Sequence, residues 1–294
     1  MSKLLRLSKI FHPKSGRAFM LPVDHGTTYG PLNGISSMPA LLRMANRFRL
    51  QAIIAHKGAI RRALESSESP WGTEFILHLS ASTQMSPDMS NKQIVSTVRH
   101  GLQIGAIGLS VHINLGVPQE HEMLRDLGLV CDEAYAWGLP VLAMMNVPEE
   151  DLSGGAAATN KIAHAVRIAG ELGADLVKVQ TPVTPQRAAE AVAAFNIPVL
   201  MAGGSSVGDK LAFFRGIREM LDAGGKGLCI GRNLFEDSRP DDMCRALGDL
   251  VHKDCSAEEA YETYLAGSSR MPLITKQTDP GIAAVQFDPW EEYA

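Results

Sequence analysis

Short apolar runs recur along the chain, and segments with helical patterns separate them. The runs are Ala18–Val23, Ala52–Ala55, Phe75–Leu79, Ala106–Val111, Pro140–Met145, Leu176–Val179, Pro198–Ala202 and Gly227–Ile230. Because each run is continuously apolar and does not alternate, we expect parallel strands buried on both faces. Eight units in the order strand, loop, helix predict an α/β protein with a closed (β/α)8 (TIM) barrel. A doubly wound open sheet is the alternative, although no Gly-x-Gly-x-x-Gly motif follows an early strand.

Local signals mark several helix ends. Ser90 with Gln93 forms a candidate capping box, and Thr184 before Pro185 predicts a helix start. Glycines fall at or near the ends of three other predicted helices: Gly101, Gly173 and Gly224.

A single barrel domain over residues 1–265 accounts for the periodic part of the chain. The length of 294 residues and the hydrophobic content of 45% allow one large core of this type. Residues 266–294 contain several prolines and no strong periodicity. We interpret them as a C-terminal tail that is partly disordered or serves as an arm against a neighbouring subunit. Residues 151–158 are small and polar, and predict a mobile loop that is a candidate lid.

Charge and cysteine usage exclude several classes of protein. The net charge is -4 and the basic residues are scattered, so we expect no nucleic-acid partner. Cys131, Cys229, Cys244 and Cys255 form no C-x-x-C pair, which favours free thiols in a reducing compartment. No apolar stretch approaches the roughly 18 residues of a membrane span, and no signal peptide is recognisable. We therefore expect a cytoplasmic protein without a membrane partner.

Lys178 is a lone basic residue within an apolar run. Desolvating an ammonium group is costly, so its presence there indicates a task or a partner. One interpretation is a Schiff-base nucleophile that attacks a ketone. The other is a strand-end lysine whose stem packs on apolar neighbours while the ammonium reaches solvent. Lys57 follows the second run in the same way and is a rival for the nucleophile, or supplies positive charge near it.

Further polar residues follow the predicted strands, at the rim where barrels of this type carry their chemistry. Asp24 is a candidate to orient substrate hydroxyls, steady a protonated lysine or transfer protons; a turn carboxylate is the alternative. His25 and His112 are candidates for proton transfer, or structural histidines held by hydrogen bonds. Their spacing does not define a metal site, and carboxylates are sparse around them. We therefore expect a metal-independent site without a cofactor.

The last two predicted strands end in glycine-containing turns. Gly203, Gly204 and Ser205 follow the seventh strand, and Gly231 and Arg232 follow the eighth. Glycines let backbone amides approach an anion, and arginine offers a fork of charged donors. Turn-forming glycine is the alternative for either loop alone. Because phosphate sites of such barrels lie in these two loops, the pair predicts a phosphorylated substrate.

Several segments together resemble a known family. They are Ile10-Phe11, Leu21–Gly26, Gly30-Pro31, Asp175–Lys178, Ala202–Gly204 and Gly231–Phe235. Over roughly residues 5–265 the chain resembles the archaeal-type class I fructose-bisphosphate aldolases, a family with heptulosonate synthase and autoinducer-phosphate thiolase branches. The resemblance implies a homo-oligomeric barrel in which Lys178 forms the Schiff base and Asp24 is the family's aspartate. It also implies phosphate contacts at the two glycine turns.

One position departs from the family pattern. Asn146 stands where the aldolases carry a tyrosine as acid and base, and an amide cannot exchange a proton as a phenol can. The leading hypothesis is a class I aldolase or transaldolase-type lyase that makes or breaks a carbon-carbon bond in a small phosphorylated ketone or ketose. The enzymatic alternative is a thiolase that moves an acyl group from a phosphorylated diketone to coenzyme A. A non-catalytic sugar-phosphate-binding protein is the second alternative.

Overall fold

Eight parallel strands close into a barrel in the computed structural model, which describes residues 1–66, 72–148, 160–182, 184–204 and 208–267. Around the barrel the order is β1, β10, β9, β8, β7, β6, β3, β2. The strands are β1 (Ala18–Pro22), β2 (Ala52–Ala55), β3 (Glu74–His78), β6 (Gly108–Asn114), β7 (Val141–Asn146), β8 (Leu176–Val179), β9 (Val199–Ala202) and β10 (Gly227–Cys229). The predicted (β/α)8 barrel is confirmed, and the closed ring excludes a doubly wound open sheet.

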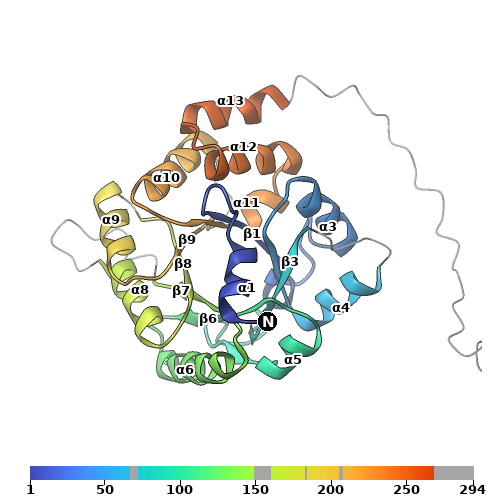
Figure 1. Cartoon of the computed structure of the whole chain (residues 1–294), viewed down its shortest axis with the longest axis vertical. Helices are drawn as coiled ribbons and strands as arrows, with labels where there is room; N and C mark the ends of the chain where they lie inside the picture. Colours follow the sequence, from blue (N-terminus) through green and yellow to red (C-terminus); the bar gives the residue numbers. More distant parts are fainter. Residues whose placement is uncertain (67–71, 149–159, 183, 205–207, 268–294) are drawn as a thin grey trace, which may run out of the picture.

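A ring of helices covers the outside of the barrel (Figure 1). It contains α3 (Met38–Arg47), α4 (Lys57–Glu65), α5 (Val98–Gln103), α6 (Glu120–Trp137), α8 (Lys161–Glu171), α9 (Pro185–Ala193), α10 (Lys210–Asp222), α12 (Pro240–His252) and α13 (Ala257–Gly267). The predicted helix start at Thr184 is confirmed, because its hydroxyl accepts from the backbone N–H of Arg187. The predicted boundary at residue 265 falls inside α13. The candidate lid, residues 151–158, and residues 268–294 of the tail lie outside the described residues.

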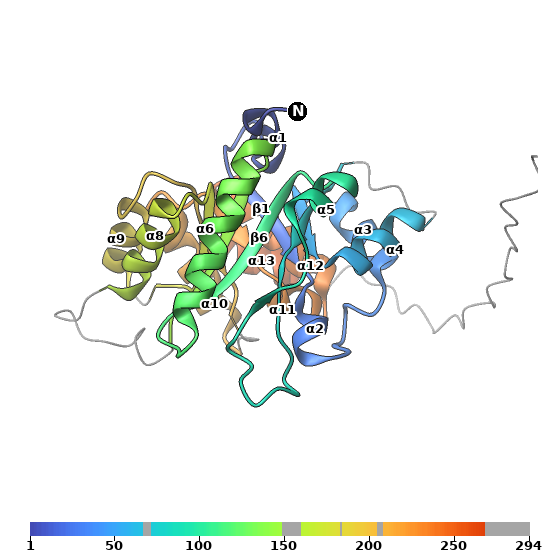
Figure 2. The ribbon, with the colours of Figure 1, turned by 90° about the horizontal axis from the view of Figure 1, so that it is seen from below.

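Side chains alternate between the inside and the outside of the barrel. Outward residues such as Ile53 and Val177 pack against the helices, whereas inward residues such as Met20 and Leu200 form a separate apolar cluster. Helix α1 (Lys3–Ile10) lies across one end of the barrel, and its buried Ile10 belongs to the inner cluster. The short helices α2 (His25–Tyr29) and α11 (Arg232–Phe235) lie at the opposite end (Figure 2). The barrel is therefore closed and apolar at the α1 end.

A small hairpin interrupts the repeat between β3 and α5. Its strands, β4 (Ser80–Ala81) and β5 (Gln93–Ile94), pair antiparallel. The predicted capping box at Ser90 and Gln93 is therefore wrong, because Gln93 pairs in a strand and Ser90 donates to the Asp88 carboxylate. Helix α5 begins after Thr97, whose hydroxyl accepts from the backbone N–H of His100. The segment between β4 and β5 leaves the barrel wall and reaches the rim.

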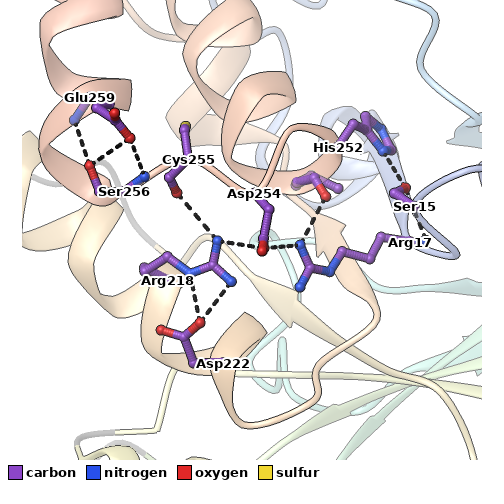
Figure 3. A network of polar contacts seen from close by, with 10 residues as sticks. Ser15, Arg17, Arg218, Asp222, His252, Asp254, Cys255, Ser256 and Glu259 are labelled. Atoms are coloured by element: carbon purple, nitrogen blue, oxygen red, sulfur yellow. Dashed lines mark hydrogen bonds and ion pairs between the residues drawn. The ribbon is translucent and has the colours of Figure 1, made fainter.

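A polar network joins the segment before β1, helix α10 and the turn between α12 and α13 (Figure 3). Asp254 accepts from Arg17 at 2.8 Å and pairs with Arg218 at 2.9 Å. Arg218 also pairs with Asp222 one turn further along α10. Asp254 has a φ of 58°, a conformation in which aspartate is better tolerated than most residues. Among the described helices, none has the length and apolar character needed to cross a membrane.

Candidate active site

A cavity of about 660 Å³ occupies the rim of the barrel at the end away from α1. Eight of the predicted site residues line it: Asp24, His25, His112, Lys178, Gly203, Gly204, Gly231 and Arg232. The sequence therefore identified positions that the fold brings together from five strands of the barrel. Of the remaining two, Lys57 lies elsewhere and Ser205 is outside the described residues.

Lys178 occupies an inward position of β8. In the parallel ladder it is paired with Met144 of β7 and Leu200 of β9, which both belong to the inner cluster. Its side chain is half-buried and faces the cavity. Its amine makes no hydrogen bond or ion pair with any residue that the structure describes. The nitrogen is therefore available to a molecule in the cavity.

Asp24 follows β1 and lies at the base of the same cavity. One carboxylate oxygen is 3.6 Å from Nε2 of His78, and the other is 3.9 Å from Nδ1 of His25. Burial raises the pKa of the Asp24 carboxyl, but His78, His25 and Lys178 together lower it more, so that its pKa lies well below the ordinary value. Asp24 is consequently a carboxylate at neutral pH.

The histidines around Asp24 are uncharged at neutral pH. Burial, the largest influence, lowers the pKa of His25 and of His78 to about 4, against the opposing effect of Asp24. Burial and the charge of Lys92 hold the pKa of His112 well below its usual range. Nδ1 of His25 and Nε2 of His112 are buried without a hydrogen-bond partner among the described residues. Each can therefore donate to, or accept from, a bound substrate.

The two glycine turns lie side by side and are tied together. Asn233 donates its amide N–H to the carbonyl of Gly203 at 2.6 Å. A Cβ at Gly203 would lie 2.9 Å from Cγ2 of Ile230, and one at Gly231 would lie 2.7 Å from the carbonyl oxygen of Pro22. Packing alone therefore requires glycine at both positions, independently of any ligand. The turns form a surface without side chains at one wall of the cavity.

Arg232 supplies positive charge beside these turns. Its guanidinium lies 5.8 Å from the centre of the Tyr29 ring, and its Nε is buried without a hydrogen-bond partner in the described part of the chain. Glycine turns that line a cavity next to such a group are suited to an anion.

Lys57 does not enter the cavity, which contradicts its interpretation as a rival nucleophile. Its side chain is exposed at the start of α4, and its ammonium donates to the carbonyl of Val95 at 2.7 Å. The physical reason is the alternation of side chains along β2. Ile54 faces the interior of the barrel, so the next residue whose side chain faces inward is His56, and the side chain of Lys57 points away.

Further residues that the sequence did not assign to the site lie at or next to the cavity. His78 does not line it, but its buried ring lies behind Asp24, and its Nδ1 is 2.7 Å from the hydroxyl of Ser110. Asn146 faces the cavity and donates to the side-chain oxygen of Asn114 at 3.2 Å. The inward position of His78 could be predicted from the sequence, since it lies two residues after the inward Ile76. Lys92 could not be predicted in this way, because it lies on the hairpin that the sequence did not predict. Within the described ranges, no group of three or more His, Cys, Asp or Glu side chains is arranged to hold a metal.

Comparison with known proteins identifies the family. Residues 18–237 match the model of the DeoC/LacD family aldolases, so the chain belongs to this family. It is 35% identical over 262 residues to 2-amino-3,7-dideoxy-D-threo-hept-6-ulosonate synthase 1 of Archaeoglobus fulgidus, covering 89% of this chain and 95% of the relative. It is 34% identical over 253 residues to 2-amino-4,5-dihydroxy-6-oxo-7-(phosphonooxy)heptanoate synthase of Streptomyces griseus, covering 85% and 90%.

The fold comparison agrees with the family. A Schiff-base-forming fructose-1,6-bisphosphate aldolase, solved to follow its reaction intermediates, superimposes with a TM-score of 0.74 at 25% identity. The match covers 85% of this chain and 100% of that structure. The predicted resemblance to class I aldolases is confirmed, and the chain is an aldolase-family enzyme.

Proposed function

We propose that this enzyme makes or breaks a carbon-carbon bond in a small phosphorylated ketone or ketose through a Schiff base at Lys178. One observation carries the proposal: a half-buried amine without a partner among the described residues faces a cavity that also contains the Asp24 carboxylate and the Arg232 turn. Because the strand is rigid, it holds the amine close to the carbonyl carbon of a bound substrate, and this proximity increases the rate of the reaction.

The substrate phosphate lies against the backbone of Gly203, Gly204 and Gly231 and is neutralised by Arg232. The Lys178 amine adds to the ketone carbon, and loss of water gives a protonated imine. Removal of a proton from the adjacent carbon then leaves an enamine, whose carbon attacks the carbonyl of an aldehyde. Addition of water to the new imine releases the product and regenerates the amine. Cleavage runs through the same steps in reverse.

Proton transfer is assigned to the side chains that line the cavity. Asp24 is ionised, so it accepts a proton or a hydroxyl hydrogen bond during bond formation. His112 offers Nε2, which is buried and unpartnered among the described residues. Since Asn146 cannot exchange protons as tyrosine does, these two groups, with water, replace the family's phenol.

The name of the Streptomyces relative's product supports the class of donor. In 2-amino-4,5-dihydroxy-6-oxo-7-(phosphonooxy)heptanoate, a ketone lies next to a phosphorylated carbon, and a hydroxyl lies two carbons away on its other side. This β-hydroxyketone pattern is the product of an aldol condensation between a phosphorylated ketone and an aldehyde. For this chain we propose a donor of the same kind, a small ketone with a phosphate on the neighbouring carbon.

Reductive trapping tests the proposal. Borohydride added with dihydroxyacetone phosphate should produce a covalent adduct in wild type, which intact-mass measurement and peptide mapping assign to Lys178. Lys178→Met keeps the stem volume and removes the amine, so it should not be trapped and should lose roughly 10³-fold or more in kcat. Lys57→Met is the matched control, because this lysine lies outside the cavity. It should be trapped like wild type.

The same variants separate the competing functions. An adduct on Lys57, or none with a panel of phosphorylated ketones, would contradict the proposal. Consumption of coenzyme A with a phosphorylated diketone, unaffected by Lys178→Met, would favour the thiolase. Binding of phosphorylated ketones without turnover by any variant would favour the non-catalytic alternative.

Assembly and location complete the proposal. We propose a homo-oligomer, on the family resemblance, and a cytoplasmic enzyme, because all four cysteines are free and three of them are buried. Size-exclusion chromatography with light scattering measures the number of subunits.

A further inference from the structure

We propose that Lys92 binds an anionic group, a carboxylate or a phosphate, on the aldehyde that reacts with the enamine, and so selects the second substrate. This inference rests on the proposed function and deepens it. Lys92 precedes β5 in the hairpin that interrupts the repeat, and its side chain lines the cavity.

Lys92 is a buried lysine whose hydrogen-bond partners are neutral; burial lowers its pKa, and the Asp24 carboxylate opposes that effect. The lysine is 9% exposed, and its ammonium donates to the hydroxyls of Ser82 at 2.7 Å and Thr28 at 3.3 Å. An ammonium has three N–H donors, so one remains for a ligand. No carboxylate of the described residues forms an ion pair with it. Because an unpaired buried charge is costly, this arrangement is better suited to an enzyme that receives an anion there.

The hairpin that carries Lys92 is fixed to its surroundings. The backbone N–H of Gln84 donates to the carbonyl of Thr28 at 2.8 Å, and its side chain donates to the carbonyl of Tyr29 at 3.1 Å. Asn114 of β6 donates to the carbonyl of Ser90 at 2.6 Å. These bonds connect the hairpin to α2 and to the barrel wall. The ammonium is therefore presented by a supported segment and not by an isolated loop.

Lys92 and the glycine turns approach the cavity from different sides. In the order of the barrel, β3, which precedes the hairpin, lies three places from β10, which precedes Arg232, and four places from β9. Burial is the largest influence on the pKa of His112 on β6, and the charge of Lys92 lowers that pKa next, which agrees with an ammonium close to β6. The hydrogen bond to Thr28 also brings the ammonium next to α2. Arg232 follows β10 on the other side.

Both positive groups line the same cavity, and we assign to each of them one end of a reaction product that carries an anionic group at both ends. Its phosphate lies at Arg232, its ketone carbon at Lys178, and its second anion at Lys92. The aldehyde component would then carry the second anion. This division explains why the cavity holds two separate cations in addition to the proposed nucleophile.

Steady-state kinetics with three aldehydes test the inference, with dihydroxyacetone phosphate as the donor. The aldehydes are 4-oxobutanoate with a carboxylate, glyceraldehyde 3-phosphate with a phosphate, and uncharged glyceraldehyde. In Lys92→Met we expect KM for the preferred anionic aldehyde to rise about 10- to 100-fold, the loss of one charge-assisted hydrogen bond. KM for glyceraldehyde should stay within about threefold of wild type. Whether the carboxylate or the phosphate responds identifies the ligand.

Two further variants separate recognition from support of the hairpin. Lys92→Arg keeps the charge and should recover much of the preference for the anionic aldehyde. Lys57→Met removes a hairpin contact at Val95 but no cavity charge, so the ratio between anionic and neutral aldehydes should not change. Equal losses with all three aldehydes in Lys92→Met, or the same selective loss in Lys57→Met, would overturn the inference.

Borohydride trapping keeps this result distinct from the proposed function. Lys92→Met should still be trapped at Lys178 by dihydroxyacetone phosphate alone, since no aldehyde takes part. Trapping without aldehyde selectivity would overturn only the role of Lys92. Absence of trapping in wild type would overturn the proposed function and this inference together.

Discussion

Asp24 keeps a negative charge although it is buried, because three histidines and Lys178 lower its pKa. The surrounding histidines have low pKa values because burial disfavours their charged forms. Among the groups that lower the pKa of Asp24, Lys178 is the lysine. The carboxylate oxygen Oδ1 is buried without a hydrogen-bond partner among the described residues. A substrate hydroxyl can fill that unused capacity.

Replacing this residue tests its role. Asp24→Asn keeps the shape and removes the charge and the basicity, so kcat should fall about 10²- to 10⁴-fold. KM for the phosphorylated ketone should change by no more than about threefold, because the proposed phosphate contacts lie elsewhere. Both values come from initial rates. A kcat near that of wild type would show that Asp24 takes no part in the reaction.

The alternation of side chains explains which individual residues were predictable. Lys178 and His112 share the inward direction of their strands, and both reach the cavity. Lys57 also lies close to the end of its strand, but it is one residue out of phase with the inward Ile54, so its side chain points away from the interior. His78 is in phase with the inward Ile76. One residue of offset along a strand separates a cavity side chain from an exterior one.

At the scale of elements, the network around Asp254 joins parts of the chain that are distant in sequence (Figure 3). The hydrogen bonds from Arg17 and Arg218 lower the pKa of the Asp254 carboxyl. If the carboxylate is removed, two guanidinium groups remain close together without their shared anion. The turn between α12 and α13 then loses its connection to α10 and to the segment before β1.

We expect graded losses of stability at this position. Asp254→Asn still tolerates the positive φ and loses only the charge, so it should cost about 1 kcal/mol or less for an exposed pair. Asp254→Ala adds backbone strain of about 1 kcal/mol. For a chain of this size each kcal/mol lowers Tm by about 2–4 °C. In calorimetry, the Tm should be highest for wild type, lower for Asp254→Asn and lowest for Asp254→Ala. Equal Tm values would contradict a stabilising network.

Elements were predictable where local pattern and tertiary packing agree. The eight barrel strands are apolar because each is covered on both faces. Thr184 predicts the start of α9 because it is the N-cap residue of that helix. The hairpin was not predictable in this way. Its strands are two residues each, and its position depends on contacts with Thr28 and Asn114, which are far away in sequence. Lys92 was missed with it.

The whole molecule carries several buried neutral histidines, which makes its stability depend on pH. The pKa of His25 and of His78 is about 4 in the folded state and about 6.5 in the unfolded chain, and that of His112 is also lowered. Between these values the unfolded state binds protons that the folded state does not. Stability is therefore retained above about pH 6.5 and falls as the pH decreases toward 4. The low pKa of Asp24 acts only below this window.

Urea unfolding at pH 7.5, 6.0 and 5.0 measures this effect. The free energy of unfolding should decrease with falling pH, by up to about 1 kcal/mol per pH unit for each fully buried histidine. His78→Asn removes one such group and should reduce the slope, whatever its effect on stability at pH 7.5. A free energy that does not vary over this range would contradict neutral, buried histidines.

Helix α1 and the apolar layer beneath Lys178 leave the described barrel accessible from its rim end. A cavity with a single opening imposes an order on substrate binding and product release. Under the proposed function the aldehyde can react only after the ketone has bound to Lys178, and both substrates and the product pass through the same opening. An excess of aldehyde then obstructs entry of the ketone, so velocity should pass through a maximum as aldehyde concentration rises.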